Sequence, residues 1–275
     1  MIGAIIGDTI GSIYEFNNIK TKDFEFFVKG MGPTDDSVLT IATAHWLLDE
    51  SESGESGECG VYYKHYANKY PNPHGGYGPS FRRWASFPGS AIAAPYNSFG
   101  NGSAMRVSPV GWAFNSEKDV LDNAKRSAEC THNHPEGIKG AQATALCIFM
   151  ARNGATTTEI KERIERDFGY DLSLTIDEIR PRYSWYGMDK SGHSVTCQDS
   201  VPQAISCALQ ARDFEDAVRN AVSIGGDSDT IACIAGGIAE ALFGVPEWMV
   251  EKVMLLLDES QNEVVSQFRS KFCNK

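Results

Sequence analysis

The chain has 275 residues, a formal net charge of −11, 42% hydrophobic residues and 22% charged residues. This balance is typical of a soluble globular protein with a sizeable core. No segment approaches the about 18 consecutive apolar residues of a membrane helix, and MIGAIIGDTIGS lacks the basic region of a signal peptide. We therefore expect a cytoplasmic protein without a membrane partner. The negative charge disfavours nucleic acid as a partner without excluding it.

The seven cysteines are odd in number and scattered, and no two form a CxxC pair. This pattern indicates neither a disulfide framework nor a zinc site. Most of them stand among apolar neighbours, where cysteine behaves as a small hydrophobic residue.

Apolar residues recur mostly at helical spacing along the chain. The segment 35–48 carries an apolar stripe that includes Val38, Ile41 and Ala42, whereas 145–152 and 230–244 are apolar on all sides and predict buried helices. The stretches 51–60 and 69–103 have the composition of surface loops, and the length of the second indicates a functional role. Strand-like alternation is scarce, and 182–199 is the place for a short hairpin. We predict one compact all-α domain over residues 1–275.

Two acidic clusters open predicted helices almost two hundred residues apart. Thr34, Asp35 and Asp36 precede TIATAHWLL, and Asp227, Asp229 and Thr230 open an apolar helix. Each cluster alone is explained equally well as a helix cap. Taken together, converging carboxylates in a partly buried place require a cation between them. Carboxylate and hydroxyl oxygens are hard ligands that suit Mg²⁺ or Mn²⁺.

A third acidic element is GAIIGDTIGSIYEFNN. Asp8 and Glu15 are seven residues apart in it, about two helical turns, so we expect both on one helix face. Glu15 ends an apolar stretch, where it is either a member of the site or a surface residue at a helix end.

With these motifs assembled, the chain resembles the ADP-ribosylglycohydrolase family, which includes the dinitrogenase reductase-activating glycohydrolases and the ADP-ribosylserine hydrolases. The resemblance rests on five segments in the family's order: GDTIGSIYEF, PTDDSVL, NSFGNGSAMRVSPVG, CTHNHPEG and GGDSDTIACIAGG. It implies an all-α single domain of orthogonally packed helices with two Mg²⁺ ions (or Mn²⁺) at its centre.

The resemblance also implies roles for individual residues. The metal ligands would be Thr34, Asp35, Asp36, Asp227, Asp229 and Thr230. Glu15 matches the family's glutamate at the metal centre, and the catalytic acids would be Glu15, Asp35 and Asp36. Substrate would be bound by Ser98, Phe99, Gly100, Asn101, Gly102 and His132, the first five in the loop that holds the phosphates and ribose.

The residues of NSFGNG agree with that reading. Glycines around Asn101 permit positive φ and close approach of a ligand, and free N–H groups can cradle a phosphate, although a turn without ligand has the same composition. Phe99 offers a ring to ribose or adenine. His134, before a proline, is expected in a loop or cap. Arg106 could pair with a phosphate, but we expect it in a structural salt bridge.

The implied activity is Mg²⁺-dependent cleavage of the N- or O-glycosidic bond between ADP-ribose and an acceptor, which is an ADP-ribosylated protein or small molecule. The NSFGNG loop is closer to the serine-type pattern, which favours an O-linked acceptor. An ADP-ribosyl-arginine hydrolase, a metal- and ADP-ribose-binding pseudoenzyme and a two-metal phosphohydrolase that cuts the diphosphate remain alternatives. We expect a monomer.

Overall fold

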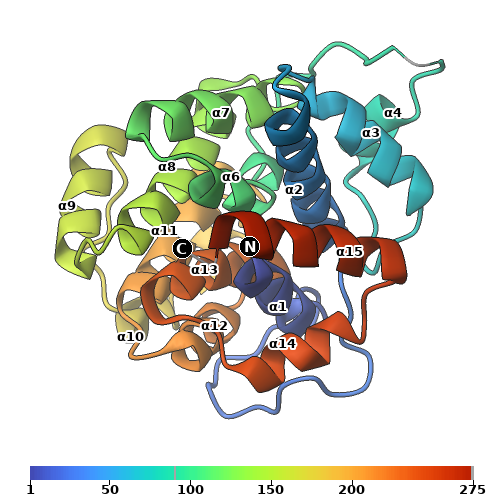
Figure 1. Cartoon of the computed structure of the whole chain (residues 1–275). Helices are drawn as coiled ribbons and strands as arrows, with labels where there is room; N and C mark the ends of the chain where they lie inside the picture. The colour runs from blue at the N-terminus through green and yellow to red at the C-terminus, as the bar shows by residue number, and fades with distance from the viewer. Residues whose placement is uncertain (90, 274–275) are drawn as a thin grey trace.

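The computed structural model describes residues 1–89 and 91–273. Helices dominate this part of the chain (Figure 1), as predicted. They are α1 (Ile2–Gly11), α2 (Asp35–Ser53), α3 (Cys59–Lys69), α4 (Pro79–Ala85), α5 (Gly102–Met105), α6 (Ser108–Ala113), α7 (Glu117–Glu129), α8 (Pro135–Arg152), α9 (Thr157–Phe168), α10 (Ile176–Ile179), α11 (Cys197–Leu209), α12 (Phe214–Ile224), α13 (Ser228–Phe243), α14 (Glu247–Met254), α15 (Glu259–Phe268) and the π-helix η1 (Arg269–Cys273).

A short hairpin lies within 182–199, where the sequence predicted one. Strand β1 (Tyr183–Ser184) pairs antiparallel with β2 (Gly187–Met188). Helix α4 corrects the prediction of an irregular loop over 69–103, because Pro79 opens a helix whose Phe81 and Trp84 are buried. In the described part of the chain, we find no helix with the length and apolar character needed to cross a membrane.

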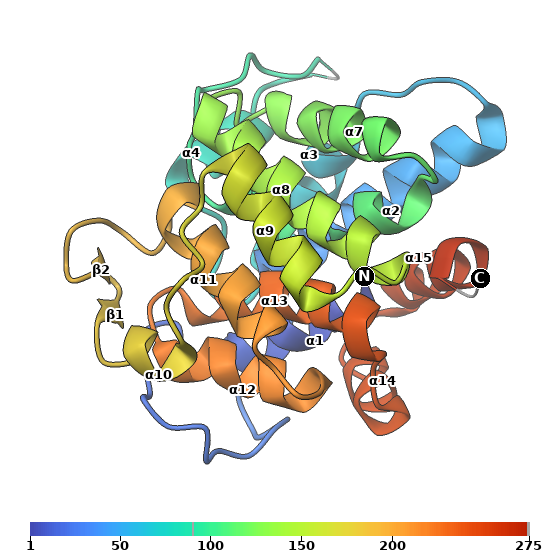
Figure 2. The same ribbon diagram turned by 90° about the vertical axis from the view of Figure 1, so that its left-hand side faces the viewer.

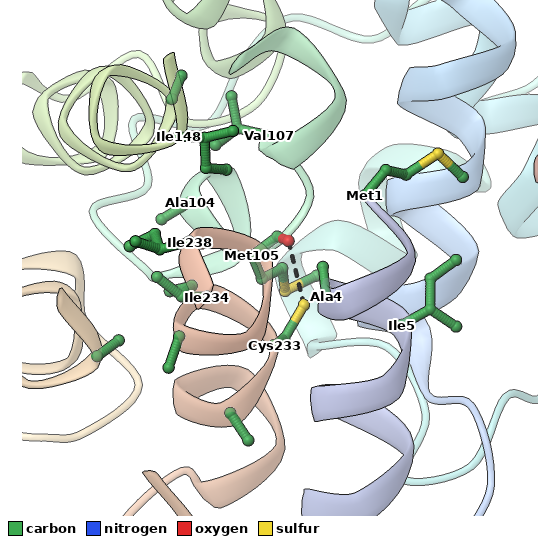
Figure 3. Packing of buried hydrophobic residues seen from close by; sticks show 14 of the residues in the cluster. Met1, Ala4, Ile5, Ala104, Met105, Val107, Ile148, Cys233, Ile234 and Ile238 are labelled. Carbon is green, nitrogen blue, oxygen red and sulfur yellow. Dashed lines mark hydrogen bonds between the residues drawn. The ribbon is translucent and has the colours of Figure 1, made fainter. Parts of the chain in front are cut away.

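Helix α13 forms the centre of the fold. Every residue from Ser228 to Glu240 is buried, as the apolar sequence predicted. Helices α1, α8, α11 and α12 pack around it, and Figure 2 shows them on its different sides. Figure 3 shows the core where α1 and α13 meet Met105, whose carbonyl oxygen accepts a hydrogen bond from the Cys233 thiol at 3.3 Å.

Helices α1 and α13 touch through their backbones because glycine recurs every four residues on α1. A Cβ atom at Gly3 would lie 2.4 Å from the carbonyl oxygen of Gly236, and one at Gly11 would lie 2.5 Å from the Cα atom of Asp229. Real Cβ atoms do not approach other atoms so closely, so only glycine permits this packing. The contact at Gly11 brings the end of α1 against the acidic start of α13.

One expectation about α1 is wrong. The helix ends at Gly11 and the chain then turns, so Glu15 does not share a helix face with Asp8. Asp8 is fully buried inside α1, whereas Glu15 is partly exposed in the following turn. Both side chains nevertheless face the same acidic region, as the next section describes.

Candidate metal centre and substrate-binding site

Three carboxylates from two distant parts of the chain converge beside the start of α13. One carboxylate oxygen from each of Glu15, Asp227 and Asp229 lies within 4.8 Å of the other two. Asp227 is the N-cap of α13 and Asp229 lies in its first turn, and both are at most 6% exposed. Glu15 reaches them from the turn after α1. The sequence predicted this group, and the structure brings its members together.

The other acidic cluster lies at the start of α2. Thr34 is the N-cap, and its hydroxyl accepts a hydrogen bond from the Asp36 amide at 3.1 Å. The same hydroxyl donates to Asp8 at 2.6 Å, and the Thr34 amide donates to Asp8 at 2.9 Å. Ser37 also donates to Asp8, through its amide and its hydroxyl. Asp8 therefore anchors the start of α2 to α1. It accepts the proton of the Thr34 hydroxyl, so one lone pair of that oxygen is left without a hydrogen-bond donor.

The two clusters lie next to each other because α1 contacts both of them, through the bond between Thr34 and Asp8 and through the packing of Gly11 on Asp229. Burial raises the pKa of Asp229 well above its usual range, and repulsion from Asp227 and Asp36 raises it further. Burial, followed by repulsion from Asp8 and Asp35, does the same to the pKa of Asp36. In these groups the desolvation of negative charge outweighs the hydrogen bonds that favour ionisation.

Asp35 and Glu15 belong to the same electrostatic group. Burial, then repulsion from Asp8, raises the pKa of Asp35 well above its usual range. Burial and the nearby Asp227 raise the pKa of Glu15 to about 8. The six converging acids thus repel one another wherever they are ionised, which is the condition that a bound cation relieves.

The residues present fit a divalent cation. The Oδ2 atom of Asp36 is buried and has no hydrogen-bond partner, although a buried oxygen of this kind is normally paired. The donor set consists of carboxylates with the hydroxyls of Thr34 and Thr230, and Thr230 is 4% exposed. Hard oxygen donors of this kind suit Mg²⁺ or Mn²⁺. The cluster can therefore bind a divalent metal.

The segment Ser98–Gly102 lies directly against this cluster. The side-chain amide of Asn101 donates to Asp227 Oδ2 at 2.7 Å and to the carbonyl oxygen of Ser194 at 3.2 Å. The backbone of this segment pairs with the chain before α11, since Asn101 N donates to the Val195 carbonyl oxygen at 3.0 Å. Phe99 is 45% exposed, so its ring is available to a ligand.

One expectation about this segment is wrong. Gly100 and Gly102 do not adopt positive φ; a Cβ atom at Gly102 would instead lie 3.0 Å from His132 Nε2, so glycine is needed for close packing. The amides of Gly100 and Asn101 are already bonded, to Ser98 Oγ and to Val195, so those two N–H groups are not free for a phosphate.

His132 faces the Gly100–Gly102 backbone from the segment between α7 and α8. It is 5% exposed, and its Nδ1 atom lies 2.8 Å from Thr131 Oγ1. Burial, aided by the charge of Arg106, lowers the pKa of His132 well below its usual range, so the ring is neutral. His134 is the N-cap of α8 and accepts a hydrogen bond from the Glu136 amide, as the sequence predicted.

Arg106 is a structural residue, but the expected salt bridge is wrong. Its guanidinium is fully buried and donates to Ser127 O at 2.9 Å and to Thr131 Oγ1 at 2.7 Å. It also lies 4.0 Å from the centre of the Tyr63 ring. The described residues give it no carboxylate partner, so carbonyl, hydroxyl and ring contacts replace the ion pair.

Several residues next to the acids were not predicted from the sequence. The long segment 69–103 approaches the site a second time. There the backbone of His74 forms an isolated parallel β-bridge with Thr34, and a Cβ atom at Gly75 would lie 3.2 Å from Glu15 Oε2. Asn18 holds the turn before α13, because it donates to the Gly226 carbonyl oxygen and accepts from its amide. These contacts join distant segments and leave no local pattern in the sequence.

Comparison with known families decides the classification. The model of the ADP-ribosylglycohydrolase family matches residues 1–272. The chain belongs to the ADP-ribosylglycohydrolase family. This is a family of hydrolases that act on ADP-ribose conjugates, in agreement with the sequence motifs.

Individual ADP-ribosylglycohydrolase relatives cover nearly the whole chain. The protein named ADP-ribosylhydrolase ARH3 from Gallus gallus is 27% identical over 90% of this chain and 86% of its own length, and that from Homo sapiens is 26% identical over 90% and 85%. A protein of Pseudomonas putida named ADP-ribosylarginine hydrolase Tri1 is 25% identical over 92% and 72%. A solved structure titled ADP-ribosylglycohydrolase-related protein complex shares the fold, with a TM-score of 0.66, 22% identity, and coverage of 98% of this chain and 96% of that one.

Proposed function

We propose that this ADP-ribosylglycohydrolase uses Mg²⁺ (or Mn²⁺) to hydrolyse the glycosidic bond between C1″ of ADP-ribose and an acceptor. The observation that carries the proposal is the meeting of the acidic starts of α2 and α13 with Glu15, directly beside Asn101 and His132. The acids supply a site for cations, and the adjoining segment with His132 supplies a surface for the substrate.

Two ions would be held by the oxygens of Thr34, Asp35, Asp36, Asp227, Asp229 and Thr230. When bound, Mg²⁺ supplies Lewis acidity and a template for the ribose hydroxyls. The unpaired Asp36 oxygen and the free lone pair of Thr34 support this ligand set. The Asn101 side chain would not bind the metal itself; by donating to Asp227 Oδ2 it orients that carboxylate.

The carboxylates also serve the reaction itself. Cleavage at C1″ builds positive charge on that carbon, which nearby negative charge stabilises. Glu15 is partly exposed at the edge of the cluster, whereas Asp36 is 2% exposed. We assign to Glu15 the role of accepting a proton from the attacking water, because it stands partly exposed at the edge of the cluster. A bound cation would lower its raised pKa and keep it ionised. Asp35 and Asp36 would bind the metal ions from the start of α2.

The ADP-ribose would extend over Ser98–Gly102 and His132. Arg106 donates to Thr131 Oγ1, and we assign the Thr131 hydroxyl proton to His132 Nδ1, which at 2.8 Å is closer than the other acceptor, the Ala128 carbonyl oxygen at 3.5 Å. The ring proton then resides on Nε2, which faces Gly102 and can donate to a phosphate oxygen. Phe99 offers its exposed ring to the ribose or adenine.

For the acceptor, we propose an O-linked, serine-type conjugate. The support is the sequence of the NSFGNG segment, which lies at the site. An arginine acceptor is the second candidate, because the Pseudomonas putida relative is named an ADP-ribosylarginine hydrolase. We further propose that residues 1–275 act as one domain and as a monomer.

A direct comparison of substrates tests the proposal. Peptides carrying ADP-ribose on serine or on arginine, and ADP-ribosylated DNA, are incubated with the protein and Mg²⁺, and products are identified by mass. Free ADP-ribose with unmodified acceptor is the expected result, fastest for the serine conjugate. Release of AMP would show a phosphohydrolase instead, and binding of Mg²⁺ and ADP-ribose without turnover would show a pseudoenzyme.

A further inference from the structure

Two of the seven free cysteines lie in contact, although they are 71 residues apart in the sequence. The Cys59 Sγ atom lies 3.7 Å from Cys130 Sγ, and its thiol also has the Arg126 carbonyl oxygen as an acceptor at 3.3 Å. Cys59 is the first residue of α3, and Cys130 is the C-cap of α7. A Cβ atom at the neighbouring Gly60 would lie 3.3 Å from Cys130 Cβ, so the start of α3 packs directly on Cys130.

The two cysteines differ in exposure and in acidity. Cys59 is 4% exposed, whereas Cys130 is half-buried and is therefore the more exposed residue of the pair. The hydrogen bond from Cys59 lowers the pKa of Cys130, and the charge of Arg106 acts in the same direction. Cys130 is thus the thiol that ionises and reacts first, and Cys59 is the one in position to resolve it.

We propose that Cys59 and Cys130 form a reversible disulfide that regulates substrate binding at this site. The Cys130 thiolate attacks a peroxide, which breaks the O–O bond and yields a sulfenic acid. The hydroxide that leaves takes up the proton released by the thiol, so the peroxide is reduced to water. The Cys59 sulfur then attacks the Cys130 sulfur; the S–S bond forms, and the hydroxyl leaves as a second water with the Cys59 proton. A dithiol reductant returns two electrons and restores both thiols.

The position of the pair connects it to the substrate-binding segment. The chain between the two cysteines contains α3, α4 and Ser98–Gly102. Cys130 is followed by Thr131 and His132, and Thr131 receives the Arg106 guanidinium and contacts His132 Nδ1. To form the disulfide, the two sulfurs must approach from 3.7 Å to about 2 Å. We expect this movement to draw Cys130, and with it Thr131 and His132, toward α3.

The metal ligands proposed above lie outside the 59–130 loop, on the starts of α2 and α13. Oxidation is therefore expected to weaken ADP-ribose binding and to leave Mg²⁺ binding unchanged. This functional consequence rests on the proposed function, whereas formation of the disulfide does not. Reversible disulfides of this kind are a known form of redox sensing in reducing compartments.

The experiment treats the reduced full-length protein with hydrogen peroxide and maps its peptides under non-reducing conditions. We expect one cross-linked peptide pair containing Cys59 and Cys130, loss of two of the seven thiols, and recovery with dithiothreitol. Closing a loop of this length is expected to raise the Tm by about 5–10 °C. Variants Cys59→Ser and Cys130→Ser should form no such cross-link and show no rise in Tm. Cys273→Ser, which removes another half-buried thiol, should form the cross-link and show the rise in Tm as the wild type does.

Calorimetric titration of oxidised and reduced protein with ADP-ribose and with Mg²⁺ supplies the functional measurement. We expect ADP-ribose affinity to fall about 5- to 10-fold on oxidation, with a matching rise in KM, while Mg²⁺ affinity and kcat stay within twofold. A cross-link at other cysteines, over-oxidation of Cys130 without a disulfide, or a disulfide without effect on ADP-ribose affinity would each overturn the proposal. If the reduced protein hydrolyses no ADP-ribose conjugate, the proposed function fails, and the peptide map and Tm still decide whether the disulfide forms.

Discussion

Gly7 of α1 lies against the backbone of Ala232 of α13, so close that a Cβ atom at Gly7 would stand 1.9 Å from the Ala232 carbonyl oxygen. The same pair of helices carries Asp8 and Asp229, each with its side chain in the acidic site. The separation of the two helices therefore sets the geometry of the site as well as the packing of the core.

Because of this contact, we expect even the addition of one methyl group at Gly7 to destabilise the protein strongly. We expect Gly7→Ala to lower the free energy of unfolding by about 2–4 kcal/mol, because the methyl group must force the helices apart against a packed core. Gly32→Ala is the control, since a Cβ atom there has no neighbour within 4 Å and the φ of Gly32 is not positive, and it should change stability by less than about 0.5 kcal/mol. Urea unfolding measures both, and an unchanged midpoint for Gly7→Ala would contradict the packing.

Asp36 offers a test of the metal centre. We expect Asp36→Asn to weaken Mg²⁺ binding at least about tenfold and to lower kcat about 100-fold or more, because it removes a charged ligand without changing shape. The metal-free variant should be at least as stable as the wild type, since one of several repelling charges is gone.

The matched control is Glu52→Gln, on the same helix but 65% exposed. It should leave both Mg²⁺ affinity and kcat unchanged. Calorimetry, turnover assays and circular dichroism provide the measurements. Intact Mg²⁺ affinity in a folded Asp36→Asn protein would remove Asp36 from the ligand set.

The repelling acids predict how stability changes with pH. The pKa of Glu15 is raised to about 8, and those of Asp35, Asp36 and Asp229 lie well above their usual range. The folded metal-free protein thus binds more protons than the unfolded chain, whose acids titrate near pH 4. Its stability should therefore fall as the pH rises from about 4 through 8.

Excess Mg²⁺ should remove most of that fall, because the metal replaces the protons and releases them. Thermal unfolding between pH 5 and 9, in EDTA and in Mg²⁺, measures the two curves. A difference in Tm between them that shrinks toward high pH would contradict the prediction.

Thr131 links the buried Arg106 to His132 through one hydroxyl. We expect Thr131→Val to raise the KM for an ADP-ribose conjugate about tenfold and to cost about 1–3 kcal/mol of stability, because it leaves Arg106 and His132 without this partner. Mg²⁺ affinity should not change. Thr131→Ser, which keeps the hydroxyl, should restore KM to within about twofold of the wild type. A fall in kcat at constant KM would instead place His132 in the chemical step.

Much of the architecture was accessible from the sequence because it follows from local and periodic signals. The uniformly apolar run after Asp229 predicted a buried helix, and Ser228–Glu240 are all buried. The doubled acidic helix starts predicted a common site because like charges are costly in a core without a cation. Ordered motifs identified the family, and the match over residues 1–272 confirms it.

Only the tertiary structure decided which groups meet. Glu15 reaches the acids from a turn, not from the helix face that its spacing from Asp8 suggested. Asn101 reaches Asp227 across 126 residues, and Cys59 meets Cys130 across 71. Sequence periodicity describes one helix or strand at a time, whereas these contacts depend on how closely two such elements pack against each other. At the centre of this protein, glycine backbones on α1 set that distance.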